Sequence, residues 1–204
     1  MSLTEQIQVR SSTSYDRYPA TFQAAADLVR SATPAACVLS FGCSTGLECA
    51  TLSELYFDRP DDRIVGVDTH TPALSRARRH NQGPRISYYD ANDPAYLSAS
   101  PFDAVFAMAV LCLHDEQAKK TGDAPARFPF SRFSELCEGL DAKVKTGGLL
   151  VIVNASYRFT DARVSKRYTP IADPTGRSGF VPKYKRDGER LRKSYPFTLF
   201  VKRA

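Results

Sequence analysis

The sequence predicts an α/β fold, a single Rossmann-like doubly wound sheet that is mostly parallel and ends in an antiparallel hairpin. Short apolar runs of strand length alternate with segments of helical periodicity, as is typical of βαβ units. The first apolar run breaks into a turn rich in glycine and small hydroxyl residues. With 204 residues, of which 43% are apolar, the chain can bury one sizeable core, so we expect one domain over residues 1–204.

The first strand and the turn after it organise the predicted fold. The apolar run from Val38 ends at Phe41, and residues 42–46 read GCSTG before helical spacing resumes at Leu47. This pattern predicts a strand, a tight turn and a helix. Glycine lets the backbone pass close to a ligand, and the first N–H groups of a helix are unpaired. Such a turn suits a nucleoside cofactor.

Acidic residues end the next two strand-like runs. The second run ends in Asp68, 22 positions after Gly46, and the third ends in Asp90. A carboxylate about 20 residues beyond a glycine turn is where a ribose diol is bound in nucleotide folds. A fourth run covers residues 102–108. Because the carboxyl ends of parallel strands meet at one edge, we expect these groups to define one crevice.

Helices are expected between these strands, where apolar residues recur at helical spacing. The first helix begins at Pro19 or Thr21, and the second runs from the glycine turn to about residue 57. Thr71 is the expected N-cap of a third helix, since Pro72 suits its first turn.

A further helix and a fifth strand are expected before the final region. Helical spacing runs from Phe130 to Val144, and Gly147 and Gly148 are expected to cap this helix. The fifth strand is then predicted over residues 149–153.

A C-terminal hairpin is predicted from two β-like runs, residues 179–184 and 195–201. Asp187-Gly188 lies between them, and Asp-Gly signals a chain reversal, so the two runs are expected to pair antiparallel. Residues 161–177 are expected to form a short helix followed by a loop.

Positive charge is concentrated in this same basic C-terminal region, residues 157–204. From residue 156 onward the chain has 13 Lys and Arg against 4 Asp and Glu, a net charge of +9, and the preceding residues carry −3. A basic end beside a cofactor crevice suits an anionic partner, although a solvated Lys- and Arg-rich surface explains it equally well.

The ordered motifs resemble those of class I S-adenosylmethionine (SAM) dependent methyltransferases. SFGCSTG is similar to the glycine motif, VGVD to the ribose motif, YYDAND to the adenine motif, FDAVFAMAVL to the fourth strand and KTGGLLVIV to the fifth. The resemblance implies that SAM is the cofactor. It also implies that residues 1–18 form a lid segment. The cofactor-binding positions that it implies are Arg17, Phe41, Gly42, Cys43, Ser44, Thr45, Gly46, Glu48, Asp68, Thr69, His70, Asp90, Ala91, Asn92, Ala107 and Met108.

A narrower resemblance is to the chemoreceptor glutamate methyltransferases. GCSTGLE is similar to their glycine motif, and the segment Tyr15–Pro19 resembles their FFRDP segment. By this match Arg17 holds the methionine carboxylate of the cofactor and Glu48 contacts the cofactor. That subfamily has Asn where this chain has Ala109 and His-Ser-Glu where it has Asn154-Ala155-Ser156. Cofactor binding therefore carries over better than the receptor substrate.

Methyl transfer from a sulfonium is an in-line displacement that depends mainly on how the acceptor is placed. His114 is the candidate general base, with Asp115 beside it, and Tyr157 and Arg158 are candidate acceptor contacts. A plain alternative is that His114 only begins a solvated helix. The expected acceptor is an oxygen, nitrogen or carboxyl group on a small anionic molecule or side chain.

Two other functions stay open at the level of sequence. An RNA methyltransferase would use the basic region, although no RNA-binding module is recognisable, and a non-catalytic SAM-binding or partner-binding protein would need no base. The five cysteines show no metal-ligand spacing, so no metal site is expected. With neither a signal peptide nor an apolar run long enough to cross a membrane, a cytoplasmic protein is expected. The oligomeric state is not determined by the sequence.

Overall fold

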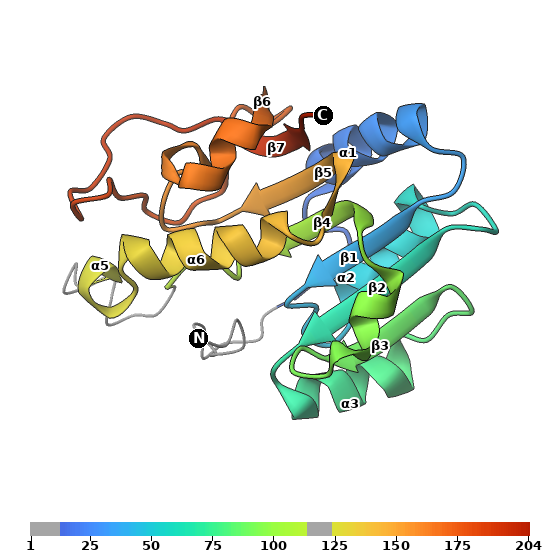
Figure 1. Cartoon of the computed structure of the whole chain (residues 1–204). Coiled ribbons are helices and arrows are strands. Elements are labelled where there is room, and N and C mark those ends of the chain that lie inside the picture. The colour runs from blue at the N-terminus through green and yellow to red at the C-terminus, as the bar shows by residue number, and fades with distance from the viewer. Residues whose placement is uncertain (1–12, 114–123) are drawn as a thin grey trace.

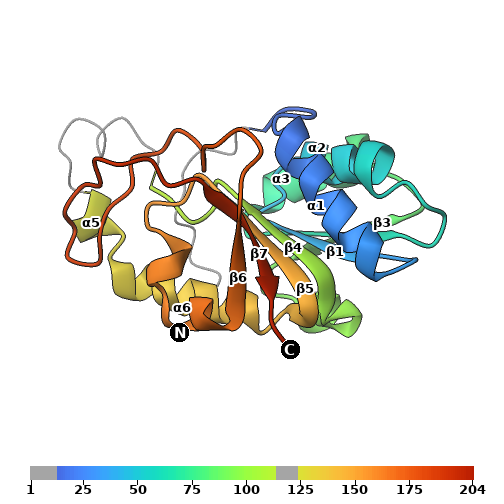
Figure 2. The same cartoon turned by 90° about the horizontal axis from the view of Figure 1, so that it is seen from above.

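The computed structural model describes residues 13–113 and 124–204. Within them a seven-stranded sheet of order β3-β2-β1-β4-β5-β7-β6 carries helices on both faces (Figures 1 and 2). Strands β1 to β5 are parallel, and β7 runs antiparallel between β5 and β6. This topology confirms the predicted fold class. The strands are β1 (Cys37–Phe41), β2 (Arg63–Asp68), β3 (Ile86–Asp90), β4 (Phe102–Met108), β5 (Val144–Val153), β6 (Tyr168–Ala172) and β7 (Phe197–Lys202).

The helices follow the expected order along the described chain. His70, rather than Thr71, takes the N-cap position of the third predicted helix, and Pro72 lies in its first turn as expected. The second predicted helix changes to a π-helical turn over Leu52–Tyr56. The described α-helices are α1 (Pro19–Ala32), α2 (Leu47–Thr51), α3 (Thr71–His80), α5 (Ala124–Arg127) and α6 (Phe130–Asp141), with 3₁₀ turns at Pro94–Ala99, Phe159–Asp161 and Arg163–Arg167.

Each face of the sheet has its own apolar layer, because successive strand residues point to opposite faces. Phe106 of β4 packs on the face covered by α1, where its ring lies 5.8 Å from that of Phe22. The next residue back, Val105, packs on the other face with Leu136 of α6. Figure 2 shows the same division, with α1, α2 and α3 on one side of the strands and α6 on the other.

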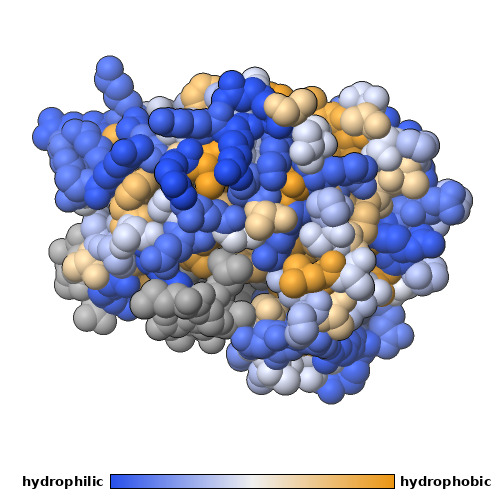
Figure 3. Space-filling view, in the orientation of Figure 1, coloured by the Kyte–Doolittle hydropathy of each residue, from blue (hydrophilic) through white to orange (hydrophobic). Residues whose placement is uncertain are grey.

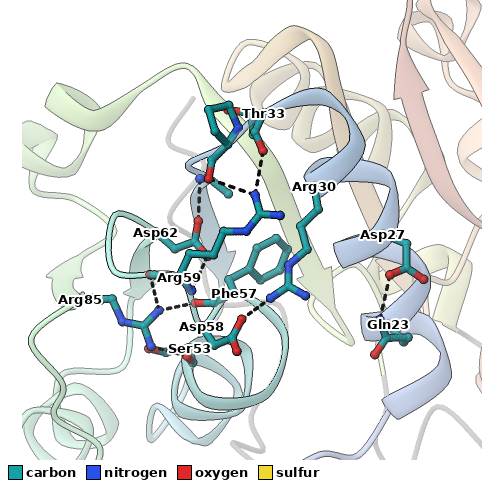
Figure 4. A network of polar contacts seen from close by, with 12 residues as sticks. Gln23, Asp27, Arg30, Thr33, Ser53, Phe57, Asp58, Arg59, Asp62 and Arg85 are labelled. Carbon is teal, nitrogen blue, oxygen red and sulfur yellow. Dashed lines mark hydrogen bonds and ion pairs between the residues drawn. The ribbon is translucent and has the colours of Figure 1, made fainter.

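The amino edge of the sheet is closed by a polar network (Figure 4). Asp62 accepts hydrogen bonds from the backbone N–H groups of Ala36, at 2.8 Å, and Arg59, at 3.1 Å. Arg85 donates to the carbonyl groups of Phe57 and Arg59. These contacts join the segments that lead into β1, β2 and β3, so this edge is structural and the carboxyl edge is left for ligands.

The predicted C-terminal hairpin is wrong in one of its two strands. The sequence predicts that β7 pairs with residues 179–184. In the structure β7 pairs instead with β6, which lies in a stretch predicted to be a loop. The Asp187-Gly188 reversal does form, since Leu191 N–H donates to the Lys183 carbonyl at 2.8 Å. This reversal connects only the two residues of an isolated antiparallel bridge, Tyr184 and Arg190. Pro170 lies in β6, and an edge strand tolerates the N–H that proline lacks.

The predicted cap of α6 is also wrong. The helix ends at Asp141, with Ala142 at the C-cap in right-handed helical geometry, and Gly147 and Gly148 lie inside β5. A Cβ atom on Gly148 would come within 2.8 Å of the Lys145 carbonyl oxygen. These glycines therefore serve the irregular start of β5, where the register with β4 shifts.

No helix within residues 13–113 and 124–204 is long and apolar enough to cross a membrane.

Candidate functional site

The carboxyl edge of the sheet holds three non-glycine residues in left-handed conformation. Ser44 follows the end of β1 with φ of 52°, Ala109 follows β4 with φ of 60°, and Asn154 follows β5 with φ of 56°. Backbone strain of this kind costs on the order of 1 kcal/mol per residue and clusters at functional sites. The strands thus turn sharply at the edge where the sequence predicts the ligand.

The glycine turn after β1 needs both of its glycines. Gly42 and Gly46 have φ values of 81° and 84°. An added Cβ atom would lie 2.1 Å from a Val110 methyl group at the first position and 2.5 Å from the Tyr88 hydroxyl oxygen at the second. The turn is therefore packed against β3 and the segment after β4, with no room for side chains.

Asp68 is fixed at the end of β2 by two backbone donors. Its carboxylate accepts the Ser44 N–H at 2.7 Å and the His70 N–H at 2.8 Å. Asp90 is its register partner at the end of β3 and accepts the Asn92 N–H at 2.8 Å. Two adjacent strands therefore present carboxylates at one edge, as the sequence predicted, with Thr69 and Ala91 directly after them and Thr45 opposite in the glycine turn.

Arg17 brings the N-terminal segment onto this edge. Its guanidinium lies 3.5 Å from the Glu48 carboxylate and donates to the Met108 carbonyl, at the end of β4, at 3.3 Å. Ser40 donates to the other Glu48 oxygen at 2.8 Å. Burial raises the pKa of Glu48, and Arg17 and Ser40 oppose that rise by stabilising the ionised form. Glu48 is thus a buried, fully bonded carboxylate below the glycine turn.

Several predicted cofactor positions have no exposed side chain to offer. Cys43, Ala107 and Met108 are buried, while Phe41 is half-buried at the end of β1. A hydrogen bond with the Cys49 thiol, together with burial, raises the pKa of the Cys43 thiol. At the three buried positions only backbone groups can face a ligand.

The two predicted acceptor contacts, Tyr157 and Arg158, lie just beyond the end of β5. Tyr157 is buried among aromatic rings, and its hydroxyl donates to the Phe128 carbonyl at 2.7 Å. Arg158 forms a two-pronged ion pair with Asp161, at 2.8 and 2.9 Å. Both side chains are bonded within the fold, and their role as acceptor contacts stays a prediction. His114 lies outside the described residues.

Asn154 was not predicted as a site residue, although it follows β5 as Asp68 ends β2. Its amide donates to the Tyr18 hydroxyl at 2.7 Å and accepts the Phe180 N–H at 2.8 Å. The N-terminal segment, β5 and the loop between β6 and β7 therefore meet at one side chain. Its position just beyond a predicted strand was the available signal.

No cluster of three metal-ligating side chains occurs in the part of the chain that the structure describes.

Comparison with known proteins agrees with the geometry of this edge. Residues 38–127 match a family model described as "Methyltransferase domain". The match begins in β1 and runs beyond β4, so it contains the glycine turn and both strand-end carboxylates. This part of the chain, a little under half of its length, is therefore similar to that methyltransferase family. The closer similarity to the chemoreceptor glutamate methyltransferases stays a prediction.

One curated relative of this chain is the trans-aconitate 2-methyltransferase of Azoarcus sp. (strain BH72). The two are 36% identical over 77 residues, which are 38% of this chain and 28% of that protein. The match thus spans less than a third of the relative's length.

Solved structures with a similar arrangement include the plantazolicin methyltransferase BpumL in complex with SAH. It is 19% identical, with a TM-score of 0.47 over 67% of this chain and 46% of that one. SAM-bound CalS10, an amino pentose methyltransferase from Micromonospora echinaspora, is 19% identical, with a TM-score of 0.46 over 74% of this chain and 56% of that one.

The residues at the carboxyl edge fit SAM, the cofactor that the resemblance to SAM-dependent methyltransferases implies. Gly42 and Gly46, both with positive φ, shape the turn between β1 and α2 at this edge. Asp68 and Asp90 offer acceptors suited to hydroxyl and amino groups, and Arg17 offers a cation suited to a carboxylate. The donor and acceptor set therefore matches the charges of the cofactor.

Proposed function

We propose that the chain transfers the methyl group of SAM to a carboxylate of a small organic acid and so forms a methyl ester. The observation that carries the proposal is the cofactor-shaped set at the carboxyl edge, with Asp68 held by two backbone donors. The named activity of the Azoarcus relative suggests the carboxyl acceptor. A net charge of +9 from residue 156 onward suits an acidic substrate.

We assign the binding of the cofactor to separate groups along this edge. Asp68 binds the ribose hydroxyls, the segment Asp90–Asn92 lies at the adenine, and Arg17 binds the methionine carboxylate. Thr69 and His70 extend the ribose side. Glu48 holds Arg17 in place from below. When bound, SAM supplies a methyl group that is activated by a positively charged sulfur.

A carboxylate acceptor needs no general base, which agrees with the bonding of the side chains just after β5. Carboxylates are ionised at neutral pH, so the protein has to bind and orient the acceptor without removing a proton from it. The side chains of Tyr157 and Arg158 are already bonded within the fold. Positioning by other groups then supplies the catalysis.

We also propose a cytoplasmic location. The five cysteines are odd in number and scattered along the sequence, which suits a reducing compartment.

Transfer of labelled methyl groups tests the proposal. The chain is incubated with methyl-labelled SAM and with trans-aconitate or other small carboxylic acids. We expect a product whose label is released by mild alkali as methanol, which is characteristic of a methyl ester. Label that enters RNA, or an alkali-stable product, would favour a different acceptor. SAH binding without any transfer would indicate a non-catalytic SAM-binding protein.

The turnover of the variant His114→Ala, measured in the same assay, distinguishes a carboxylate acceptor from a hydroxyl or amine acceptor. With a carboxylate acceptor its turnover should stay close to wild type and the rate should be flat from about pH 6 to 8. A hydroxyl or amine acceptor that uses His114 as base predicts a loss of at least about a hundredfold.

A further inference from the structure

Lys183 belongs to the loop between β6 and β7, but its ammonium reaches the carboxyl end of β5. Nζ donates a 2.8 Å hydrogen bond to the carbonyl of Ala155. The next residue, Tyr184, donates its N–H to the Ser156 carbonyl at 2.8 Å, so the backbone at Lys183 is fixed to the segment after β5. In Figure 1 the arrowheads of β1, β4 and β5 point toward the side where this loop lies.

The surroundings of Lys183 do not neutralise its charge. Nζ lies 5.8 Å from the centre of the Tyr195 ring, and the thiol of Cys112 approaches from the segment after β4. Among residues 13–113 and 124–204, no carboxylate lies within ion-pair distance of Lys183. An ammonium has three donors, and the Ala155 carbonyl takes one of them.

A cation in this position costs stability. Partial burial lowers the pKa of Lys183 to about 8. Buried charges in proteins are normally paired, because taking a charge out of water without a partner is expensive. Two open donors on a half-buried ammonium therefore suit an anionic ligand.

Lys183 stands at the same edge as the proposed methyl-transfer site. Asn154, next to the Ala155 carbonyl that Lys183 contacts, bonds to the Tyr18 hydroxyl at 2.7 Å. The neighbouring Arg17 reaches the Met108 carbonyl at the end of β4. Figure 3 shows hydrophilic side chains gathered at the upper left, over the loop that carries Lys183.

We propose that Lys183 binds a second carboxylate of the acceptor, the one that is not methylated. An ion-paired carboxylate is a weaker nucleophile, so the carboxylate on Lys183 anchors the acid and a different one accepts the methyl group. The acceptors are therefore di- or tricarboxylic acids, and monocarboxylic acids are poor substrates. This inference rests on the proposed function and narrows its substrate class.

Binding of such an acid has a protonation signature. At about pH 8.5 roughly three quarters of Lys183 is neutral in the free protein. A bound carboxylate favours the charged form and raises the pKa of Lys183, so each acid that binds draws a proton from the buffer. The described titratable groups that face Lys183 are Cys112 and Tyr195. Burial raises the pKa of Tyr195 above its ordinary value, so its hydroxyl stays neutral.

The test is calorimetric titration of trans-aconitate into the SAH-loaded protein at about pH 8.5, in buffers of different ionisation enthalpy. We expect the wild type to take up a proton. Lys183→Gln should weaken binding by at least about tenfold, without proton uptake, because the positive charge of the donor is lost. Lys183→Arg should bind within a few-fold of wild type, also without uptake, since Arg is always charged. Lys185→Gln, at an exposed residue paired with Glu189, is the matched control and should match wild type in both respects.

Three results would overturn the inference. The first is equal affinity and equal proton uptake in wild type and Lys183→Gln. The second is loss of SAH binding in Lys183→Gln, which would show that Lys183 serves the fold. The third is equal KM of wild type and Lys183→Gln for a tricarboxylic acid. In that third case, if the wild type still forms an ester, only the role of Lys183 is rejected and the proposed function is kept. If the wild type forms no ester, both the proposed function and the role of Lys183 are rejected.

Discussion

Asp68 is a side chain whose geometry is fixed before any ligand binds. The N–H groups of Ser44 and His70 hold its two oxygens at 2.7 and 2.8 Å. Each oxygen keeps a further lone pair for a ligand hydroxyl. A carboxylate that is oriented in advance loses little conformational entropy on binding, so it contributes more to affinity than a free one.

Removing this carboxylate tests the cofactor site. Asp68→Ala should weaken SAH binding by about 1.5–3 kcal/mol, because hydrogen bonds to a charged group are lost. Isothermal titration calorimetry gives the affinity, and the exposed Asp61→Ala is a control of the same chemistry. A circular dichroism spectrum like that of wild type would show that the fold is kept. Affinity equal to wild type would mean that the ribose is bound elsewhere.

At the scale of single elements, the π-helical turn after α2 is held by a side chain from a distant segment, the one that leads into β3. The last carbonyl groups of a helix have no partner inside it. Arg85, just before β3, donates to the carbonyl groups of Ser53, Phe57 and Arg59, with the Arg59 contact at 3.0 Å (Figure 4). The guanidinium thus ends the π-helical turn and ties it to the amino edge of the sheet.

Loss of Arg85 should therefore lower stability without harming the site. Arg85→Ala is expected to reduce the free energy of unfolding by about 1–3 kcal/mol, because buried carbonyl groups lose their donor. Urea unfolding followed by circular dichroism measures the change. Arg76→Ala, at an exposed position in the middle of α3, should change stability by less than about 0.5 kcal/mol. If Arg85→Ala matched this control, the contacts would contribute nothing to the fold.

Across the whole molecule, Asp173 joins the beginning of the described chain to its end. It follows β6 and accepts the hydroxyl groups of Thr21 in α1, at 2.7 Å, and Thr198 in β7, at 2.9 Å. Burial by itself would raise the pKa of Asp173. Hydrogen bonds from Thr175, Thr21 and Thr198 outweigh that effect and lower the pKa below its usual 3.8. The ionised form is therefore the one that the fold stabilises.

This bonding predicts a pH-dependent loss of stability. A carboxyl group with a lowered folded-state pKa adds stability above pH 3.8, and the gain disappears as the pH falls through the folded-state value. Asp173→Asn should therefore be less stable than wild type at neutral pH by about 1.5–3 kcal/mol. The difference should shrink in urea unfolding curves taken below that pH, whereas exposed Asp61→Asn should show no such trend. A deficit that is the same at every pH would exclude ionisation as its cause.

Local patterns in the sequence are enough to predict the parallel part of the fold and the residues at its carboxyl edge. Patterns within short stretches of chain predict the parallel strands, the turn at Gly42 and Gly46, and the positions of Asp68 and Asp90. Such patterns are local, because a strand and the turn that ends it are neighbours in sequence. Parallel strands also bring their carboxyl ends to one edge without further information.

The arrangement of the last third of the chain depends on contacts between segments that are distant in the sequence. The Asp-Gly turn formed locally, but β7 paired with β6, where Pro170 fits because that strand is at the edge of the sheet. The same packing buried Tyr157 and brought Lys183 back to the end of β5. Pairing between distant segments depends on which apolar faces can be covered together, and no single stretch of sequence contains that information.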